Sequence, residues 1–282
     1  MTTKQQQYTL SINKYDGKLR LVSALSELIE TRYSDIFHSV LVHGSVATNE
    51  VIAYSDFDGL LIVKDMFVDS KRLQKFKKES MKLILKFDPL QHHGWFQIKA
   101  SQLNDYPQYY LPYEILEHSK LLFPNTETLD LKLSINTELI DYKKSLKQLI
   151  KSIEQQSILD FDKERLYDIK SFLSKVMLLP SMYYSVKYAR GIFKKQSFEM
   201  VKPNFNGKEW ECIERASNLR LSWSYNLSSF QKNVMTRPEK IFRRLTKKMI
   251  APKASEELKN TLDDEFFESL RLYIKAINEQ VL

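Results

Sequence analysis

The hydrophobic pattern of this chain changes its period near residue 126. Before that point, short apolar runs typical of strands alternate with segments of helical spacing. After it, the spacing is helical nearly to the end. Strands are predicted at 40–42, 57–63, 95–98 and 121–123, and helices at 17–33 and 69–86. We therefore predict an α+β protein with a mixed sheet and flanking helices in residues 1–125, followed by a helical bundle in residues 126–282.

The helical second half begins after a turn signal. Pro124, Asn125 and Thr126 mark the expected domain boundary. Helices are predicted at 139–153, 162–194 (one helix, or two broken near Pro180), 206–227, 237–250 and 258–281. No repeat interrupts this pattern, so the second half is expected to form one helical domain.

Two acidic residues stand near the start of the chain between two apolar runs. The first run ends in Gly44 and Ser45, and Asp56-Phe57-Asp58 opens the second. Successive side chains of a strand point to opposite faces, so the two acids are expected to share a face. Neighbouring carboxylates repel each other unless a cation lies between them. Such oxygen ligands suit Mg²⁺, which combines one or two carboxylates with substrate phosphates. The glycine allows a phosphate to approach the backbone, and the serine adds a hydroxyl and an N–H.

This pattern, over about residues 38–63, resembles the nucleotidyltransferase superfamily that includes DNA polymerase beta and kanamycin nucleotidyltransferase. The resemblance implies transfer of a nucleoside monophosphate from a nucleoside triphosphate to a hydroxyl acceptor. It implies that Asp56 and Asp58 are catalytic and bind two Mg²⁺ (or Mn²⁺) ions, and that Gly44 and Ser45 bind the triphosphate. The helical half would close the cleft over nucleotide and acceptor. The motif does not identify the acceptor, which can be a small molecule, a protein or an RNA such as tRNA.

One part of the superfamily pattern is missing. In the superfamily, the strand after the helix supplies a third carboxylate, which can take the proton from the attacking hydroxyl. Residues 91–98 contain no Asp or Glu, but they include His92 and His93. Adjacent strand residues face opposite ways, and a neutral imidazole can accept a proton near pH 7, so we favour His93 as the catalytic replacement. The alternative is that the ring packs into the sheet.

Two lysines in the helical half are candidates for nucleotide binding. Lys194 and Lys195 follow the long predicted helix, and in related helical domains a lysine near such a helix often reaches the triphosphate. Cations at an exposed helix end, which complement the helix dipole, explain them equally well. Trp210 and Trp223 could stack on a nucleobase, although core packing is the more common role of such residues.

Composition limits the class of protein. The single cysteine, Cys212, excludes a disulfide framework and a cysteine-rich zinc site. The first residues lack the apolar core of a signal peptide, and no window suits a membrane span, so we expect a cytoplasmic protein with no membrane partner. The net charge is +8, and residues 190–253 carry an excess of ten positive charges. This excess favours an anionic partner, or it is an ordinary solvated surface.

Two other functions are compatible with these residues. The missing third carboxylate fits a catalytically impaired module that binds nucleotide or a partner chain without turnover. The basic half fits an RNA-binding protein whose affinity falls steeply as salt rises.

Overall fold

The computed structural model describes residues 5–108, 110–136, 141–156 and 165–282, in two compact units. The first unit comprises Met1–Val51, Ser55–Ile140 and Lys232–Arg244. The second comprises Ile52–Tyr54, Asp141–Gln231 and Leu245–Leu282. The predicted α+β class with a mixed sheet is confirmed.

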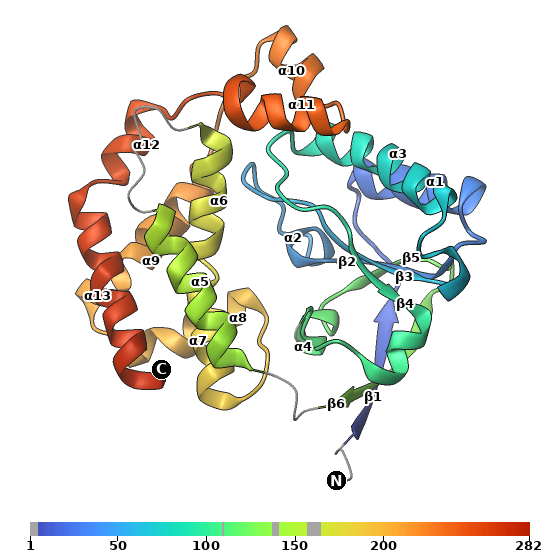
Figure 1. Ribbon diagram of the computed structural model, residues 1–282, viewed down its shortest axis with the longest axis horizontal. Helices are drawn as coiled ribbons and strands as arrows, with labels where there is room; N and C mark the ends of the chain where they lie inside the picture. The colour runs from blue at the N-terminus through green and yellow to red at the C-terminus, as the bar shows by residue number, and fades with distance from the viewer. Residues whose placement is uncertain (1–4, 109, 137–140, 157–164) are drawn as a thin grey trace. The chain divides into compact units, whose positions relative to one another are not determined.

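A four-stranded sheet is the centre of the first unit. Its strands run in the order β4 (Phe96–Lys99), β3 (Asp58–Val63), β2 (Phe37–His43) and β5 (Lys120–Phe123). β3 is parallel to β4, and the other neighbours are antiparallel. One face is covered by α1 (Arg20–Arg32) and α3 (Lys71–Phe87) (Figure 1). The apolar stripes of both helices pack there against the alternate strand residues Val40, Val42, Leu61 and Val63.

The opposite face is covered by a two-stranded antiparallel sheet of β1 (Gln5–Asn13) and β6 (Thr128–Asn136). Neither strand was among those predicted, although apolar and polar residues alternate along β6. β1 opens with three exposed glutamines, and only Leu10 and Ile12 of this strand are buried. They pack with Leu131 and other residues of β6 against the second face of the central sheet. β6 follows residue 125, where the domain boundary was expected, and is part of the first unit.

Gly59 allows the two aromatic rings beneath the sheet to pack closely. A Cβ at this position would lie 2.4 Å from the ring of Trp95. Trp95 packs edge to face on Phe57, with ring centroids 4.9 Å apart. The indole Nε1 of Trp95 donates to the Ser80 Oγ of α3 at 2.9 Å. These contacts fix the start of β3 against the helical layer.

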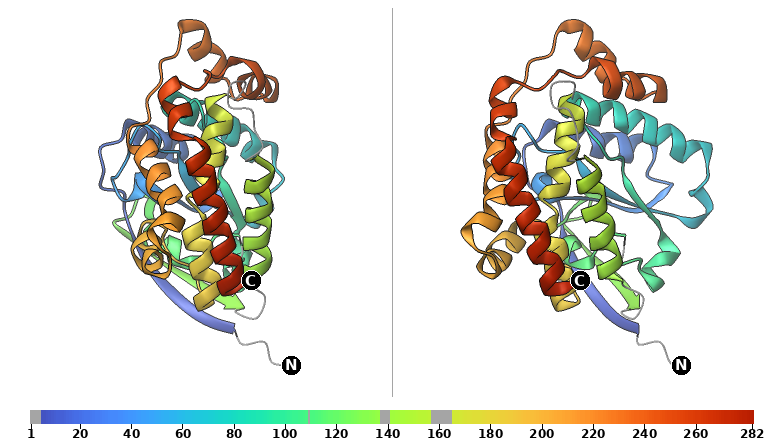
Figure 2. Two further views of the ribbon diagram at one scale, coloured as in Figure 1. Left: turned by 90° about the vertical axis from the view of Figure 1, so that its left-hand side faces the viewer. Right: turned by 60° about the vertical axis from the view of Figure 1, so that its left-hand side comes forward.

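The second unit is a bundle of helices, as predicted (Figure 2). Its helices are α5 (Tyr142–Gln156), α6 (Leu166–Val176), α7 (Leu179–Tyr188), α8 (Lys194–Val201), α9 (Gly207–Leu221), α12 (Glu256–Thr261) and α13 (Asp264–Val281). The predicted segment 162–194 forms separate helices, with the break just before Pro180, which lies in the first turn of α7. The predicted starts at 139 and 162 lie outside the described residues.

Four further short α-helices lie in the described chain, which also has 3₁₀ turns at Asp65–Phe67, Ala100–Asp105 and Lys202–Asn204. The four short α-helices are α2 (Gly44–Ala47), α4 (Tyr113–Leu116), α10 (Ser229–Met235) and α11 (Lys240–Leu245). The predicted helix 237–250 is therefore shorter, and a π-helical turn, Thr246–Ile250, follows α11. Within the described residues, no helix has both the length and the hydrophobicity that crossing a bilayer requires.

Candidate functional site

The turn between β2 and α2 brings Gly44 against a carboxylate. Gly44 has φ +67°, a conformation that L side chains rarely adopt. A Cβ built on Gly44 would lie 3.0 Å from Oδ2 of Asp58. Ser45 follows in the first turn of α2, and its side chain is half-buried. The structure therefore brings Gly44 against Asp58, although more than ten residues separate them in the sequence.

The two acids have different backbone settings. Asp58 is the first residue of β3 and is paired across the sheet with His43. Asp56 lies in the loop before the strand, so the expected strand alternation does not extend to it. Phe57, between them, is 1% exposed and packs into the core on the helical side of the sheet. Oδ1 of Asp56 is buried, and both acidic side chains are intermediate in exposure.

Gln91 holds the backbone between the two acids. Its side chain is fully buried, its Oε1 accepts from the Phe57 N–H at 2.9 Å, and its Nε2 donates to the Phe57 carbonyl at 2.8 Å. The same Nε2 donates to the His93 carbonyl at 3.2 Å. Arg243 of α11 donates in turn to the main-chain carbonyl of Gln91. A buried amide thus fixes the Asp56-Phe57-Asp58 backbone from a loop more than 30 residues away.

His43 is buried beside Asp58. Directly opposed residues of an antiparallel pair share a face, so the two side chains are neighbours. The ring of His43 is 5.5 Å from that of Phe96. Burial lowers the pKa of His43, and the nearby Asp58 charge opposes this effect only in part. No described residue hydrogen-bonds to its Nε2. A neutral imidazole is therefore part of the wall of this site.

β4 presents no acid on the Asp58 face. Parallel pairing aligns Leu60 with Phe96 and Ile62 with Ile98, so the face of Asp58 continues on β4 through Phe96 and Ile98. Gly94 lies in the loop before this strand. Phe96 therefore lies where an acidic residue of β4 would approach the site.

The remaining predicted site residues are His93, in the first unit, and Lys194 and Lys195, in the second. His93 is exposed in the loop before β4 and is linked to the site through the Gln91 side chain. Lys194 and Lys195 open α8, which belongs to the second unit. Within the first unit, the structure therefore places Gly44 against Asp58, whereas the two lysines belong to the second unit.

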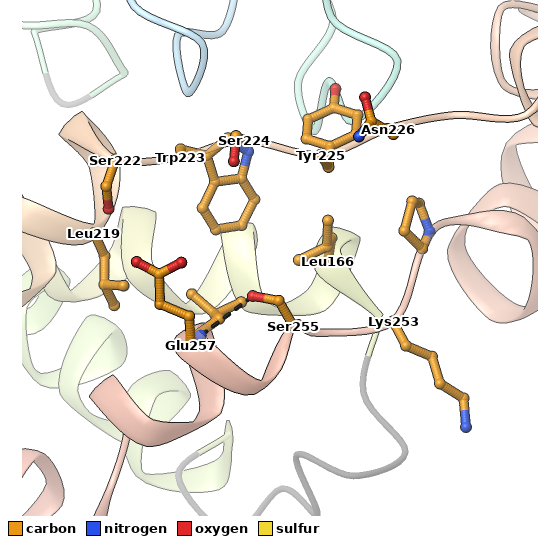
Figure 3. Close-up of a pocket in the computed structure, with 12 residues that line it drawn as sticks. Leu166, Leu219, Ser222, Trp223, Ser224, Tyr225, Asn226, Lys253, Ser255 and Glu257 are labelled. Atoms are coloured by element: carbon orange, nitrogen blue, oxygen red, sulfur yellow. Dashed lines mark hydrogen bonds between the residues drawn. The ribbon is translucent and has the colours of Figure 1, made fainter.

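The second unit has a pocket of about 220 Å³ of its own (Figure 3). The segment of Ser222 to Asn226 forms one wall, and the start of α12 forms the other. Trp223 is 5% exposed and packs edge to face on Tyr54, with centroids 5.1 Å apart. Trp210 is buried against Phe205 and Tyr273. Both tryptophans thus have packing roles, and one of them also lines a pocket.

The donor set of the site suits a hard divalent cation. Among the described residues, no three His, Cys, Asp or Glu side chains converge as a metal-binding group. Two carboxylates are nevertheless what Mg²⁺ commonly takes from a protein, with phosphate oxygens and water completing its shell. Oδ2 of Asp58 lies 3.0 Å from the position that a Cβ of residue 44 would occupy, so this carboxylate borders the glycine turn. Asp56 and Asp58 therefore fit an ion that arrives with a phosphorylated substrate.

Two residues of this site were not identified from the sequence. His43 directly precedes the glycine, but its pairing with Asp58 depends on a register that the long β2–β3 connection leaves undetermined. No local sequence pattern indicates the role of Gln91, because this role depends on its hydrogen bond with Phe57, which is 34 residues away in the sequence. Both roles arise from tertiary structure.

Comparison with known proteins gave limited matches. No protein-family model and no curated protein matches this sequence. Among solved structures, the chain is similar to the spectinomycin adenyltransferase AAD(9) from Enterococcus faecialis, crystallised with ATP and spectinomycin. The match covers 83% of this chain and 100% of that chain, with 13% identity and a TM-score of 0.43. A likeness this low does not assign an activity.

Proposed function

We propose that this protein is a nucleotidyltransferase, which transfers a nucleoside monophosphate from a nucleoside triphosphate to a hydroxyl acceptor. The observation that carries the proposal is the packing of Gly44 against Oδ2 of Asp58. A glycine turn without a side chain, directly beside a carboxylate, suits a bound triphosphate and its counter-ion. In the reaction, the acceptor oxygen bonds to the α-phosphorus, and the bond to the β-phosphate oxygen breaks to release pyrophosphate.

The proposed roles follow the chemistry of each side chain. Asp56 and Asp58 hold Mg²⁺, which when bound neutralises charge on the phosphates. Gly44 and Ser45 receive the β- and γ-phosphates through backbone N–H groups and a hydroxyl. Positioning and charge neutralisation do most of the work in phosphoryl transfer, so a rigid backbone at these residues matters more than a strong base.

The proton acceptor and the cationic contacts are further parts of the proposal. His93 is proposed to take the acceptor proton, because its exposed ring is on the loop that leads into β4. Lys194 and Lys195 are proposed to bind the triphosphate as point charges. The acceptor is proposed to be a small molecule, a protein or an RNA.

Label transfer tests the proposed activity. The protein is incubated with Mg²⁺ and each of the four nucleoside triphosphates, radiolabelled at the α-phosphate, and with small-molecule, protein and RNA acceptors. We expect label on one acceptor class, and at least about a hundredfold loss for Asp56→Asn or Asp58→Asn, as when a group that stabilises transition-state charge is removed. Asp65→Asn serves as the control, because Asp65 lies beyond β3 and accepts from the Ser101 N–H.

A second candidate function is nucleotide binding without turnover. The observation in its favour is the presence of Phe96 and Ile98 on the Asp58 face of β4, where an acid would otherwise stand. Calorimetry distinguishes the two functions. Mg²⁺-dependent triphosphate binding without pyrophosphate release, across the same acceptors, supports the binding module. Absence of Mg²⁺-dependent triphosphate binding contradicts both functions.

A further inference from the structure

We propose that the groove between α3 and the α10–α11 segment binds a single-stranded nucleic acid. The groove belongs to the first unit and has a volume of about 770 Å³. Residues of α3 line one wall, and residues 233–242 line the other. Figure 1 shows α11 next to α3. This inference does not depend on the proposed nucleotidyl transfer, because it uses other residues and concerns binding in the absence of triphosphate.

The groove has an excess of positive charge. Lys75, Lys78 and Lys82 share one face of α3, because residues three or four apart in a helix are neighbours. Arg237 lines the opposite wall. The acidic lining residues are Glu79 and Glu239.

Both glutamates already form ion pairs with basic side chains. Glu239 pairs with Lys78 at 3.1 Å. Glu79 pairs with Arg32, outside the groove, at 2.9 Å and accepts from the Tyr33 hydroxyl at 3.0 Å. Within the described part of the chain, neither Lys75 nor Lys82 forms an ion pair, and both side chains are exposed. The groove therefore offers cations to a ligand that brings its own negative charge.

An aromatic side chain lies among these cations. The guanidinium of Arg237 is 4.6 Å from the ring centroid of Phe242, and it donates to Oδ1 of Asn233 at 3.3 Å. Phe242 is half-buried and lines the groove. Proteins bind single-stranded nucleic acids with cations that follow the phosphate backbone. Aromatic rings and arginine side chains stack on the bases. A paired duplex would not expose the base faces that such a ring contacts.

This wall of the groove is also connected to the candidate active site. Arg243, on the same helix as Phe242, donates to the carbonyl of Gln91. The Gln91 side chain holds both backbone groups of Phe57. A nucleic acid bound in the groove would therefore contact α11, the helix that is hydrogen-bonded to the loop next to Asp56 and Asp58.

Fluorescence anisotropy with a labelled single-stranded RNA of about 12 nucleotides tests the inference. The protein is used at full length, without triphosphate, at about 50 mM and about 200 mM salt. We expect binding that weakens with salt, and a loss of about tenfold or more in affinity for Lys75→Glu/Lys82→Glu, with the salt slope reduced by about two. We expect Phe242→Ala to weaken binding severalfold and to leave the salt slope unchanged.

Lys143→Glu/Lys147→Glu is the matched control, because it changes net charge equally on exposed residues of α5 in the second unit. We expect it to bind within about twofold of wild type. Thermal unfolding confirms that each variant is folded. No RNA binding by the wild type at low salt overturns the inference, as does an equal loss in both charge variants. Preference for an RNA duplex or for a polyglutamate peptide over the single strand overturns the assignment of ligand class.

Discussion

At Gly44, backbone conformation and a neighbouring carboxylate act together to exclude a side chain. The residue has φ +67°, and the space that a Cβ would need is bounded by Oδ2 of Asp58. An alanine would therefore be strained and would also displace the acid. Glycine adopts the positive φ and leaves room for the carboxylate at no steric cost.

We predict that Gly44→Ala destabilises the protein by about 1–2 kcal/mol, the cost of the left-handed conformation for a residue with a Cβ. If the site binds triphosphate, the same change abolishes that binding. Urea unfolding and calorimetry with Mg²⁺ and triphosphate measure the two effects. Gly207→Ala is the control, since a Cβ there meets nothing within 4 Å. Unchanged stability and binding in Gly44→Ala would contradict this account.

Gln91 gives a second prediction at the residue scale. Replacement by Met keeps the volume but leaves the buried N–H and carbonyl of Phe57 without their partner. We expect a loss of about 2–4 kcal/mol in the free energy of unfolding, because two buried backbone groups lose their hydrogen bonds. Urea unfolding measures it, with Gln148→Met on the exposed side of α5 as the control. Equal stability of the two variants would show that the Gln91 side chain does not hold this loop.

At the element scale, side-chain caps explain where several helices begin. Ser70 accepts from the Leu73 N–H at the start of α3, and Asn206 forms a capping box with Glu209 at the start of α9. α13 begins at Asp263, whose carboxylate accepts from the Phe266 N–H at 2.9 Å and pairs with Arg215 at 2.7 Å. These side chains satisfy N–H groups that the helix itself leaves unpaired.

We predict that Asp263→Ala destabilises the protein by about 1 kcal/mol, the usual cost of removing an N-cap. The Arg215 guanidinium holds the pKa of Asp263 below its usual 3.8. A lowered carboxyl pKa means that the unfolded state binds the proton more tightly than the folded state does. The stabilisation that the Asp263 carboxylate contributes is therefore present above about pH 4 and is lost as the pH falls further. Urea unfolding of the wild type and of Asp263→Ala between about pH 3 and pH 7 measures the difference in their free energies of unfolding. A stability difference that stays constant at low pH would contradict the assigned cause.

The sequence predicted the elements that have strong local patterns. β3, β5, α1 and α3 all lie within the predicted segments or within two residues of them, and β2 begins three residues before the predicted strand. β6 was missed although Leu129, Leu131, Leu133 and Ile135 alternate with polar residues, which is the local pattern of a half-buried strand. In β1 only Leu10 and Ile12 are buried, and the local pattern does not show that its partner lies more than 100 residues away.

At the scale of the whole molecule, the single cysteine reports on the opening of the second unit. Cys212 is fully buried on α9, and burial raises the pKa of its thiol to about 12. The thiolate is the reactive form, so the folded protein offers almost none of it to an alkylating reagent.

We predict that iodoacetamide labels the native protein at least roughly a thousandfold more slowly than the urea-unfolded chain, because modification requires unfolding of a marginally stable domain. Mass spectrometry at about pH 8 measures both rates. Ala216→Gly, on the same helix, serves as a comparison, since a destabilised α9 should raise the native rate. Rapid labelling of the folded wild type would show that Cys212 is accessible.

The sequence alone determined the α+β class, the helical second half and the spacing of Gly44, Ser45, Asp56 and Asp58, because hydrophobic period and short motifs are local properties of a chain. Only the tertiary structure decided that Asp58 lies against Gly44, that His43 is its buried neighbour and that Gln91 holds the loop between the acids. Those contacts depend on strand register and on a side chain from a distant loop. Both are selected by the packing of the whole unit, which no local pattern contains.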